Sequence, residues 1–325
     1  MKNFFLIILL FQASSVFGEV DWTRTNSCEY KNFNNSDLIE QLIDGMTVED
    51  KVGQVIQGDL DFISPEDVKK FKIGSVLNGG NTAPNGNKYS SADDWKNLSK
   101  EFYDASPSYK GIKIPVLWGT DAVHGHNNVI GATLFPHNIG LGATGNIQLM
   151  QSIGEAIALE VLSTGVAWTF APTIAVPQDD RWGRTYEGFS EDPILVSKLG
   201  KAFILGLQGE GDTLLDDNHV IATAKHFMGD GGTFEGIDQG NTIISEIGLK
   251  EIHGYPYFDA LDACAQTVMA SFNSWNGQKL HGYDELLTDI LKNDMQFDGF
   301  VVGDWNGHGQ VEGCSNAKCA QSFNA

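Results

Sequence analysis

Short apolar runs of five or six residues recur along the chain and are separated by longer segments of mixed polarity. Runs of this length, rich in Val, Ile and Phe and bounded by polar or turn-forming residues, are typical of buried β-strands. The pattern therefore predicts strands at Ile73–Leu77, Ile114–Trp118, Val166–Phe170, Val220–Ala224, Thr267–Phe272 and Gly299–Gly303.

The segments between these runs carry apolar residues at helical spacing. Near the start of the chain, Ser36–Val52 presents an amphipathic stripe of Leu38, Ile39, Leu42, Ile43 and Met46. Thr47, with Asp50 three residues later, predicts the cap of a second helix within this segment. The same periodicity predicts helices at Asp93–Ser106, Ile147–Ser163, Pro193–Gly209, Lys250–Ala263 and Asp284–Asn293.

Strands and helices alternate along the chain, an order that predicts a parallel sheet, either doubly wound or closed into a barrel. Polar residues follow the predicted strands at Asn78, Asp121, Thr173, Lys225, Asn273 and Asp304. In a barrel such residues converge on one mouth, whereas an open sheet uses a single switch point. We therefore expect an α/β fold of the (β/α)8 barrel type, with no domain boundary between residues 19 and 325.

The N-terminal residues predict a segment that is removed on export. Lys2 precedes the apolar run Phe4–Phe11, and small residues lead to Gly18. The run is shorter than the ~20 apolar residues that a membrane span needs, so a membrane anchor is the weaker interpretation, as is a buried helix. We expect a signal peptide at residues 1–18 and a secreted or periplasmic protein.

Charge and cysteine content limit the partners of the chain. Its 42 acidic and 21 basic residues give a formal charge of −21, which repels phosphate backbones and anionic lipid. We expect neither nucleic acid nor membrane as a partner. Cys28 and Cys264, with Cys314 and Cys319, suit an exported protein, and the close spacing of the last two permits a loop disulfide. Zinc is the alternative, although no Cys-x-x-Cys pair or nearby histidine supports it.

Two motifs have alternative interpretations. Gly140–Gly145 matches G-x-G-x-x-G, but Pro136 breaks the strand that a dinucleotide fingerprint must follow. Asp121, His124 and His126 include enough ligand types for a metal, but no third carboxylate or cysteine is adjacent. A hydrogen bond from Asp121 to a neutral ligand is the preferred interpretation. We therefore expect no cofactor and no metal.

Further polar groups have the chemistry of a sugar site. The segment Asp179–Glu187 combines charges with Trp182 and Tyr186, and sugar sites pair aromatic faces with charged hydrogen-bonding groups. Lys225–His226 directly follows a predicted strand and would present donors to hydroxyls. Asp304 is a lone carboxylate at a strand end, the location expected of a barrel nucleophile.

Four long motifs, in order along the chain, resemble those of glycoside hydrolase family 3. They are Trp118–Asn128 with Ala132–Asn138, Arg181–Glu187 with Ser190–Asp192, Ala224–Thr233, and Gly299–Trp305. The resemblance extends from about Leu38 to the last residue, and four motifs in register are far more specific than one short pattern.

The resemblance implies a retaining, exo-acting β-glucosidase that removes terminal non-reducing β-D-glucosyl residues from β-glucosides or β-glucan oligosaccharides. It also implies an N-terminal (β/α)8-like barrel with an α/β sandwich domain after it. Carried over position by position, Asp304 resembles the nucleophile and Trp305 part of the aromatic wall. The residues that would grip the glucose hydroxyls are Asp121, Arg184, Lys225 and His226.

The chain departs from the family pattern in two ways. Phe272 stands where a Tyr is common in the family's β-glucan hydrolases, which removes a hydroxyl near the nucleophile. The general acid/base of two-domain members is a Glu of the second domain, and single-domain members use a His where the loop Gly229–Gly236 has none. We therefore expect a chain truncated before its last β/α unit, without the sandwich domain and its acid/base.

Other hypotheses remain open at this stage. If an acid/base lies within the chain, Glu187, Asp230 and Glu235 are the candidates. A non-catalytic, glucan-binding remnant of such an enzyme is the alternative function, and a nicotinamide-dependent oxidoreductase is a weaker third.

Overall fold

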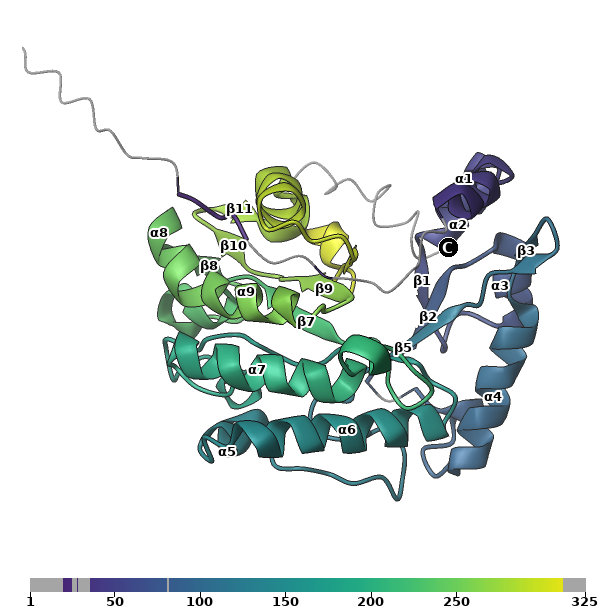
Figure 1. The fold of residues 1–325 in the computed structure, drawn as a ribbon, viewed down its shortest axis with the longest axis horizontal. Coiled ribbons are helices and arrows are strands. Elements are labelled where there is room, and N and C mark those ends of the chain that lie inside the picture. Colours follow the sequence, from purple (N-terminus) through teal and green to yellow (C-terminus); the bar gives the residue numbers. More distant parts are fainter. Residues whose placement is uncertain (1–19, 25–27, 29–35, 81, 312–325) are drawn as a thin grey trace, which may run out of the picture.

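Seven parallel strands in the computed structural model lie side by side in the order in which they occur along the chain (Figure 1). The structure describes residues 20–24, 28, 36–80 and 82–311. The strands are β1 (Gln57–Asp59), β2 (Ser75–Asn78), β5 (Leu117–Thr120), β6 (Trp168–Thr169), β7 (Thr223–Phe227), β9 (Thr267–Ala270) and β12 (Phe300–Val302). Parallel bridges between Trp168 and Ile221 and between Thr173 and Lys225 join β6 to β7. The expected parallel α/β arrangement is confirmed, and closure into an eight-unit barrel stays a prediction.

Helices connect the strands and cover their outer side (Figure 1). They are α1 (Ser36–Asp44), α2 (Val48–Gln54), α3 (Pro65–Phe71), α4 (Ala92–Ala105), α5 (Asn138–Gly142), α6 (Ile147–Ser163), α7 (Pro193–Gln208), α8 (Glu246–Gly248), α9 (Tyr255–Asp262) and the π-helices η6 (Leu249–Gly254) and η8 (Glu285–Asp294). Thr47 and Asp50 form the predicted capping box at the start of α2. Ser64 and Ser91 cap α3 and α4 in the same way.

Short strands lie outside the parallel order. An antiparallel pair joins β3 (Ser108–Tyr109) to β4 (Ile112–Lys113), and β10 (Ser274–Trp275) pairs with β8 (Asn241–Thr242) and β11 (Gln278–Lys279). None of these was predicted, and neither were β1 and α3. Strands of two or three residues carry too few positions for a period to be detected.

Two predicted strands were placed about three residues too early. The strand predicted at Ile114–Trp118 begins at Leu117, because Pro115 cannot donate to the sheet. The strand predicted at Val220–Ala224 is β7, which continues to Phe227. Lys225–His226 therefore lies within a strand and not after it. Every residue of β7 is buried, so no alternation of polar and apolar positions marks where the strand ends.

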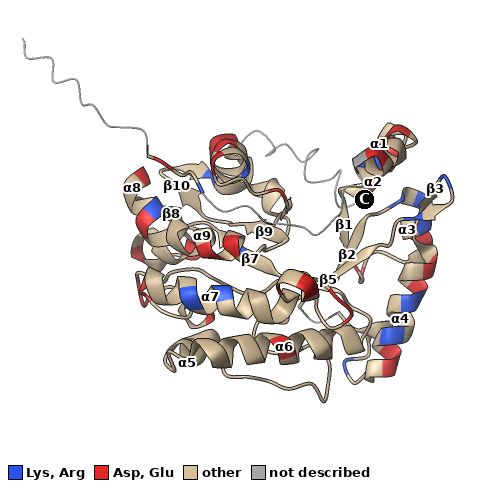
Figure 2. Ribbon diagram, in the orientation of Figure 1, with Lys and Arg blue, Asp and Glu red and all other residues tan. Residues whose placement is uncertain are grey.

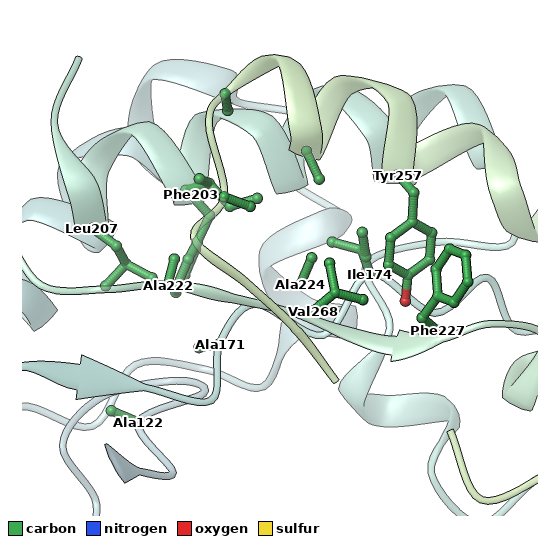
Figure 3. Packing of buried hydrophobic residues seen from close by; sticks show 14 of the residues in the cluster. Ala122, Ala171, Ile174, Phe203, Leu207, Ala222, Ala224, Phe227, Tyr257 and Val268 are labelled. Carbon is green, nitrogen blue, oxygen red and sulfur yellow. The ribbon is translucent and has the colours of Figure 1, made fainter. Parts of the chain in front are cut away.

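Two apolar clusters hold the fold together. The larger lies between the strands and the outer helices, and Figure 3 shows Phe203 and Leu207 of α7 beside Ala222, and Tyr257 of α9 beside Phe227. The smaller contains Trp168, Phe170, Met269 and Val302, with Leu77, Leu117 and Ile221 packed against it. These side chains come from both ends of the strand order, so the sheet curls around them. Charged residues gather mainly on the outer helices (Figure 2).

The segment before α1 is anchored to residues between Glu246 and Met295. The Trp22 ring stacks on Phe258 with centroids 6.4 Å apart, and its Nε1 donates to Glu246. Arg24, nearly fully buried, donates to the Met295 carbonyl at 2.9 Å. Cys28 and Cys264 form a disulfide, while the predicted pairing of Cys314 with Cys319 lies outside the described residues.

Replacing both Cys28 and Cys264 with serine should lower the free energy of unfolding by about 4 kcal/mol, because the bond joins residues 236 positions apart and so closes a long loop in the unfolded chain. Trp22 and Arg24 would still hold the segment, so the folded structure should be retained. Urea unfolding of the double variant measures the effect, and thiol reduction of the wild type should reproduce it. Equal midpoints for all three samples would contradict the prediction.

Two further expectations concern segments near the chain's start and middle. Residues 1–18, the predicted signal peptide, lie outside the described residues. Within the described part of the chain, no helix combines the length and apolar character needed to cross a bilayer.

Gly140–Gly145 lies in α5 and the turn after it, and an irregular segment precedes α5, so the strand–turn–helix unit of a dinucleotide fingerprint is not formed here.

Candidate functional site

Six polar side chains, contributed by strand ends and by the loops that follow them, form a network at one end of the sheet. They are Asp121 after β5, Arg184 and Glu187 in the loop after β6, Lys225 and His226 at the end of β7, and Asp230 after it. The network consists of two hydrogen-bonded groups, the pair Asp121–Lys225 and the chain Glu187–Arg184–His226–Asp230, and the charge of Lys225 acts on Glu187. Asp304 follows β12 and approaches the network at His226. Carboxyl ends of parallel strands meet at one edge, which is why residues from four segments of the chain come together.

The buried ammonium of Lys225 is paired with a partly exposed carboxylate. Lys225 Nζ donates to Asp121 Oδ1 at 2.8 Å, and the Lys225 side chain is only 5% exposed whereas that of Asp121 is 45% exposed. A buried ammonium needs such a partner. Within the part of the chain that the structure describes, the second oxygen of Asp121 accepts no hydrogen bond, so it could accept hydrogen bonds from hydroxyls.

A fork of hydrogen bonds orients Arg184 and fixes the proton of His226. Arg184 donates from Nε and from its Nη2 to the two oxygens of Glu187, each at 2.8 Å. The same Nη2 lies 3.0 Å from His226 Nε2. Since a guanidinium only donates, His226 Nε2 must accept, and the ring proton sits on Nδ1. Nδ1 then donates to Asp230 Oδ2 at 2.9 Å.

Burial and charge act in opposite directions on the Arg184–Glu187 pair. Burial alone would lower the pKa of Arg184, but the hydrogen bonds and charge of Glu187, helped by Asp230 and Asp304, raise it. Burial alone would raise the pKa of Glu187, but the hydrogen bonds and charge of Arg184 lower it. Both groups are therefore charged at neutral pH, and Glu187 is held as a carboxylate rather than as a proton donor.

The two oxygens of Asp304 differ in their surroundings. Oδ1 accepts the backbone N–H of Trp305 at 2.7 Å. Oδ2 is buried, finds no hydrogen-bond partner among the described residues, and lies 3.9 Å from His226 Nε2. One oxygen is thus anchored by the backbone and the other faces the network. A carboxylate oxygen arranged in this way can attack an electrophilic carbon.

Trp305 is 57% exposed and lies against the end of β2. A side chain at Gly79 would clash with its ring, since a Cβ there would lie 2.6 Å from Trp305 Cζ3. The same Cβ would approach Asp59 Oδ2, which accepts the Gly79 N–H at 2.7 Å. The exposed indole therefore borders the network from the side of β1 and β2.

The structure does not bring every expected residue into the network. Trp182, expected to offer an aromatic face, is a core residue whose Nε1 donates to Asp238. His124 and His126 hydrogen-bond elsewhere, to the Phe135 carbonyl and to Thr164 Oγ1. Within the described ranges, no three His, Cys, Asp or Glu side chains are grouped so that they could hold a metal.

The sequence prediction missed two parts of the site. Glu187 and Asp230 were named only as possible acids, but they orient Arg184 and His226. His281, whose Nε2 accepts the Asp304 N–H at 3.0 Å, was not predicted at all. The spacing of Arg184 and Glu187 by three residues could have indicated an ion pair, whereas His281 is separated from Asp304 by 23 residues and carried no signal.

Replacing Glu187 with glutamine should lower the free energy of unfolding by about 2 kcal/mol at pH 7, because Arg184 loses its charged partner. The folded protein holds the pKa of Glu187 below its ordinary value of 4.5. The stabilisation is therefore complete above pH 4.5 and is lost as the pH falls through the lowered pKa. Urea unfolding of both proteins at about pH 7 and about pH 3.5 tests this; a difference that grows on acidification would contradict it.

Comparisons with known proteins agree with this architecture. The family model described as "Glycosyl hydrolase family 3 N terminal domain" matches residues 47–325. "Lysosomal beta glucosidase" of Dictyostelium discoideum is 31% identical over 290 residues, 82% of this chain and 35% of that protein. "Periplasmic beta-glucosidase" of Salmonella typhimurium is 30% identical over 275 residues, 85% of this chain and 34% of that protein.

A solved structure is more similar still. The exo-1,3/1,4-beta-glucanase (ExoP) from a Pseudoalteromonas species superposes with a TM-score of 0.88 and 52% identity, over 91% of this chain and 38% of that one. The chain therefore spans between 34% and 38% of the length of these relatives. With the family model matched over most of its residues, the chain belongs to glycosyl hydrolase family 3.

Proposed function

We propose that the protein carrying this chain hydrolyses terminal, non-reducing β-D-glucosyl residues of β-glucosides or β-glucan oligosaccharides, with retention of configuration. The observation that carries the proposal is Asp304, whose Oδ2 is buried, unpartnered among the described residues and directed toward His226 and Arg184. Relatives named as β-glucosidases and an exo-β-glucanase support the substrate class.

In the first step, Asp304 Oδ2 attacks the anomeric carbon and the bond to the aglycone oxygen breaks, with its electron pair leaving on that oxygen. A carboxylic acid supplies the proton that the oxygen needs. In the second step, water attacks the same carbon, the bond to Oδ2 breaks, and the acid's conjugate base takes the water proton. The product has the configuration of the substrate because the anomeric carbon undergoes two displacements, each with inversion.

The remaining network residues would bind the terminal glucose. The second carboxylate oxygen of Asp121 has no hydrogen-bond partner among the described residues and could accept hydroxyl protons, and the buried Lys225 can donate beside it. His226 Nε2 and the Arg184 guanidinium adjoin Asp304, so they would bind the hydroxyls nearest the anomeric carbon. Trp305, exposed and next to Gly79, would form one wall of the pocket.

We assign the acid/base to a residue outside this chain, as the family resemblance implies. Two of the three candidates within the chain are occupied otherwise. Glu187 is ionised in its pair with Arg184, and Asp230 accepts both His226 Nδ1 and the Gly231 N–H. Glu235 lies in the turn Phe234–Gly236, and its charge acts on Arg181.

An extracytoplasmic location is part of the proposal. The disulfide between Cys28 and Cys264 needs an oxidising compartment. One relative is named as a periplasmic β-glucosidase. The N-terminal residues match a signal peptide, so we propose a secreted or periplasmic protein.

The function is tested by following the hydrolysis of p-nitrophenyl β-D-glucoside by NMR. We expect the β-anomer of glucose to form first and the α-anomer to grow in only by mutarotation. p-Nitrophenyl β-D-xyloside, which lacks the hydroxymethyl group, should be the poorer substrate. Initial release of the α-anomer would contradict the retaining mechanism, and tight glucose binding without hydrolysis would support a glucan-binding remnant.

A further inference from the structure

The backbone of Asp304 rests on the imidazole ring of His281. His281 lies in the short helix η7 (Leu280–Gly282), and its Nε2 accepts the Asp304 N–H at 3.0 Å. Because Nε2 accepts, the ring proton must sit on Nδ1. The backbone of Ser271, directly after β9, raises the pKa of the same ring. The histidine thus links the end of β9 to the loop after β12.

The loop that carries Asp304 is shaped around this ring. A Cβ at Gly307 would lie 2.1 Å from His281 Nε2, so only glycine fits there, and a Cβ at Gly303 would lie 3.6 Å from the ring. The Asp304 carbonyl accepts the Gly307 N–H at 2.9 Å, which turns the loop over the imidazole. On the other side the Phe272 ring lies 5.7 Å away, centroid to centroid. The ring is therefore enclosed on two sides by groups that fix its orientation.

We propose that His281 is a positioning residue, which holds the Asp304 carboxylate in its attacking orientation by accepting the Asp304 backbone N–H. This inference rests on the proposed role of Asp304 as nucleophile. The His281 bond fixes the Asp304 backbone, and the Trp305 N–H fixes Oδ1. With both hydrogen bonds in place, Oδ2 of Asp304 is directed toward His226. Phe272 has no hydroxyl, so it cannot hydrogen-bond the carboxylate. The carboxylate is therefore oriented by the backbone N–H groups of Asp304 and Trp305.

The arrangement predicts that the rate at which Asp304 attacks a sugar depends on the protonation of His281. An imidazolium has no lone pair, so the Asp304 N–H would lose its acceptor and meet a second N–H. Burial lowers the pKa of His281, while Asp304 and the Ser271 backbone oppose this and His308 and Lys279 add to it. The ring is therefore neutral at neutral pH. The hydrogen bond from the Asp304 N–H to Nε2 is lost as the pH falls through the lowered pKa of His281.

The test is the inactivation of the protein by 2,4-dinitrophenyl 2-deoxy-2-fluoro-β-D-glucoside, whose leaving group needs no protonation. The rate constant at saturation, kinact, reports the attack, and the concentration at half-saturation, KI, reports sugar binding. His281→Leu should lower kinact about 100-fold, the loss expected when a reacting group is displaced by about 1 Å, and change KI little. His281→Gln, whose amide oxygen can replace Nε2 as acceptor, should retain kinact within about 10-fold.

The pH profile separates positioning from packing. In His281→Gln, which cannot titrate, the acid limb of kinact should move to lower pH by about half a unit or more. His219→Leu, near Asp216 and remote from the site, is the matched control and should behave as wild type. If His281→Leu does not fold, the profile of His281→Gln decides the question.

Failure of the positioning role and failure of the proposed function give different outcomes. If the wild type is labelled at Asp304 but His281→Leu is labelled equally fast, or the acid limb of His281→Gln is unchanged, the positioning role is overturned. If the wild type is labelled at another residue, the role of Asp304 itself is wrong and His281 has no nucleophile to position.

Discussion

Replacing Asp304 with asparagine should reduce kcat/KM for an aryl β-glucoside by a factor of about 10⁴ or more. The amide is a poor nucleophile, but it has nearly the shape of the carboxylate. Its oxygen can still accept the Trp305 N–H that Oδ1 accepts at 2.7 Å. Circular dichroism and the urea midpoint should therefore stay close to those of wild type.

Asp289→Asn, on the exposed side of η8, is a matched control and should leave kcat/KM unchanged. Asp304→Gly offers a second readout, because the cavity left by the side chain can admit azide. Azide attacks from the face that the carboxylate used, and the product should be the α-glucosyl azide. Full activity of Asp304→Asn, or a β-glucosyl azide from Asp304→Gly, would exclude Asp304 as the nucleophile.

Replacing Asp121 with alanine should reduce kcat/KM by a factor of about 100 or more, a loss of transition-state stabilisation on the order of 3 kcal/mol or more, because hydroxyls and Lys225 both lose an acceptor. The Lys225 side chain is 5% exposed and its Nζ pairs with Asp121 at 2.8 Å, so the variant also leaves a buried charge without its carboxylate. Asp121→Asn should lose less, since its amide oxygen can still accept from Lys225.

A series of monodeoxy aryl glucosides sharpens this prediction. The wild type should discriminate against the substrate that lacks the hydroxyl bound by Asp121, and Asp121→Ala should no longer do so. Asp93→Ala, exposed near the start of α4, is the matched control. An unchanged kcat/KM for Asp121→Ala would place this residue outside the pocket.

The longer helices were predicted well because their periodic signal is local, whereas the seven-residue α3 was missed. The capping box of Thr47 with Asp50 is formed, and α6 occupies the predicted range Ile147–Ser163. Strand ends were predicted less well. The sheet is buried on both faces, so β7 carries no alternation, and its end at Phe227 depends on pairing with β9 rather than on its own residues.

The site was predicted in outline from topology and resemblance. Asp121 pairs with Lys225, Arg184 with His226, and Asp304 lies 3.9 Å from His226 at the same end of the sheet. What the sequence could not show is how these groups are held. Whether Glu187 takes the role of an acid or of a partner for Arg184, and whether His281 touches the Asp304 backbone, depends on contacts made only in the folded chain.

Labelling by a mechanism-based inhibitor tests the central claim most directly. Wild-type protein treated with 2,4-dinitrophenyl 2-deoxy-2-fluoro-β-D-glucoside should gain one fluoroglucosyl group, because the fluorine slows release of the covalent intermediate. Peptide mapping by mass spectrometry should place that group on Asp304, and Asp304→Asn should not be labelled. A label on any other residue, or a label that persists in Asp304→Asn, would contradict the account.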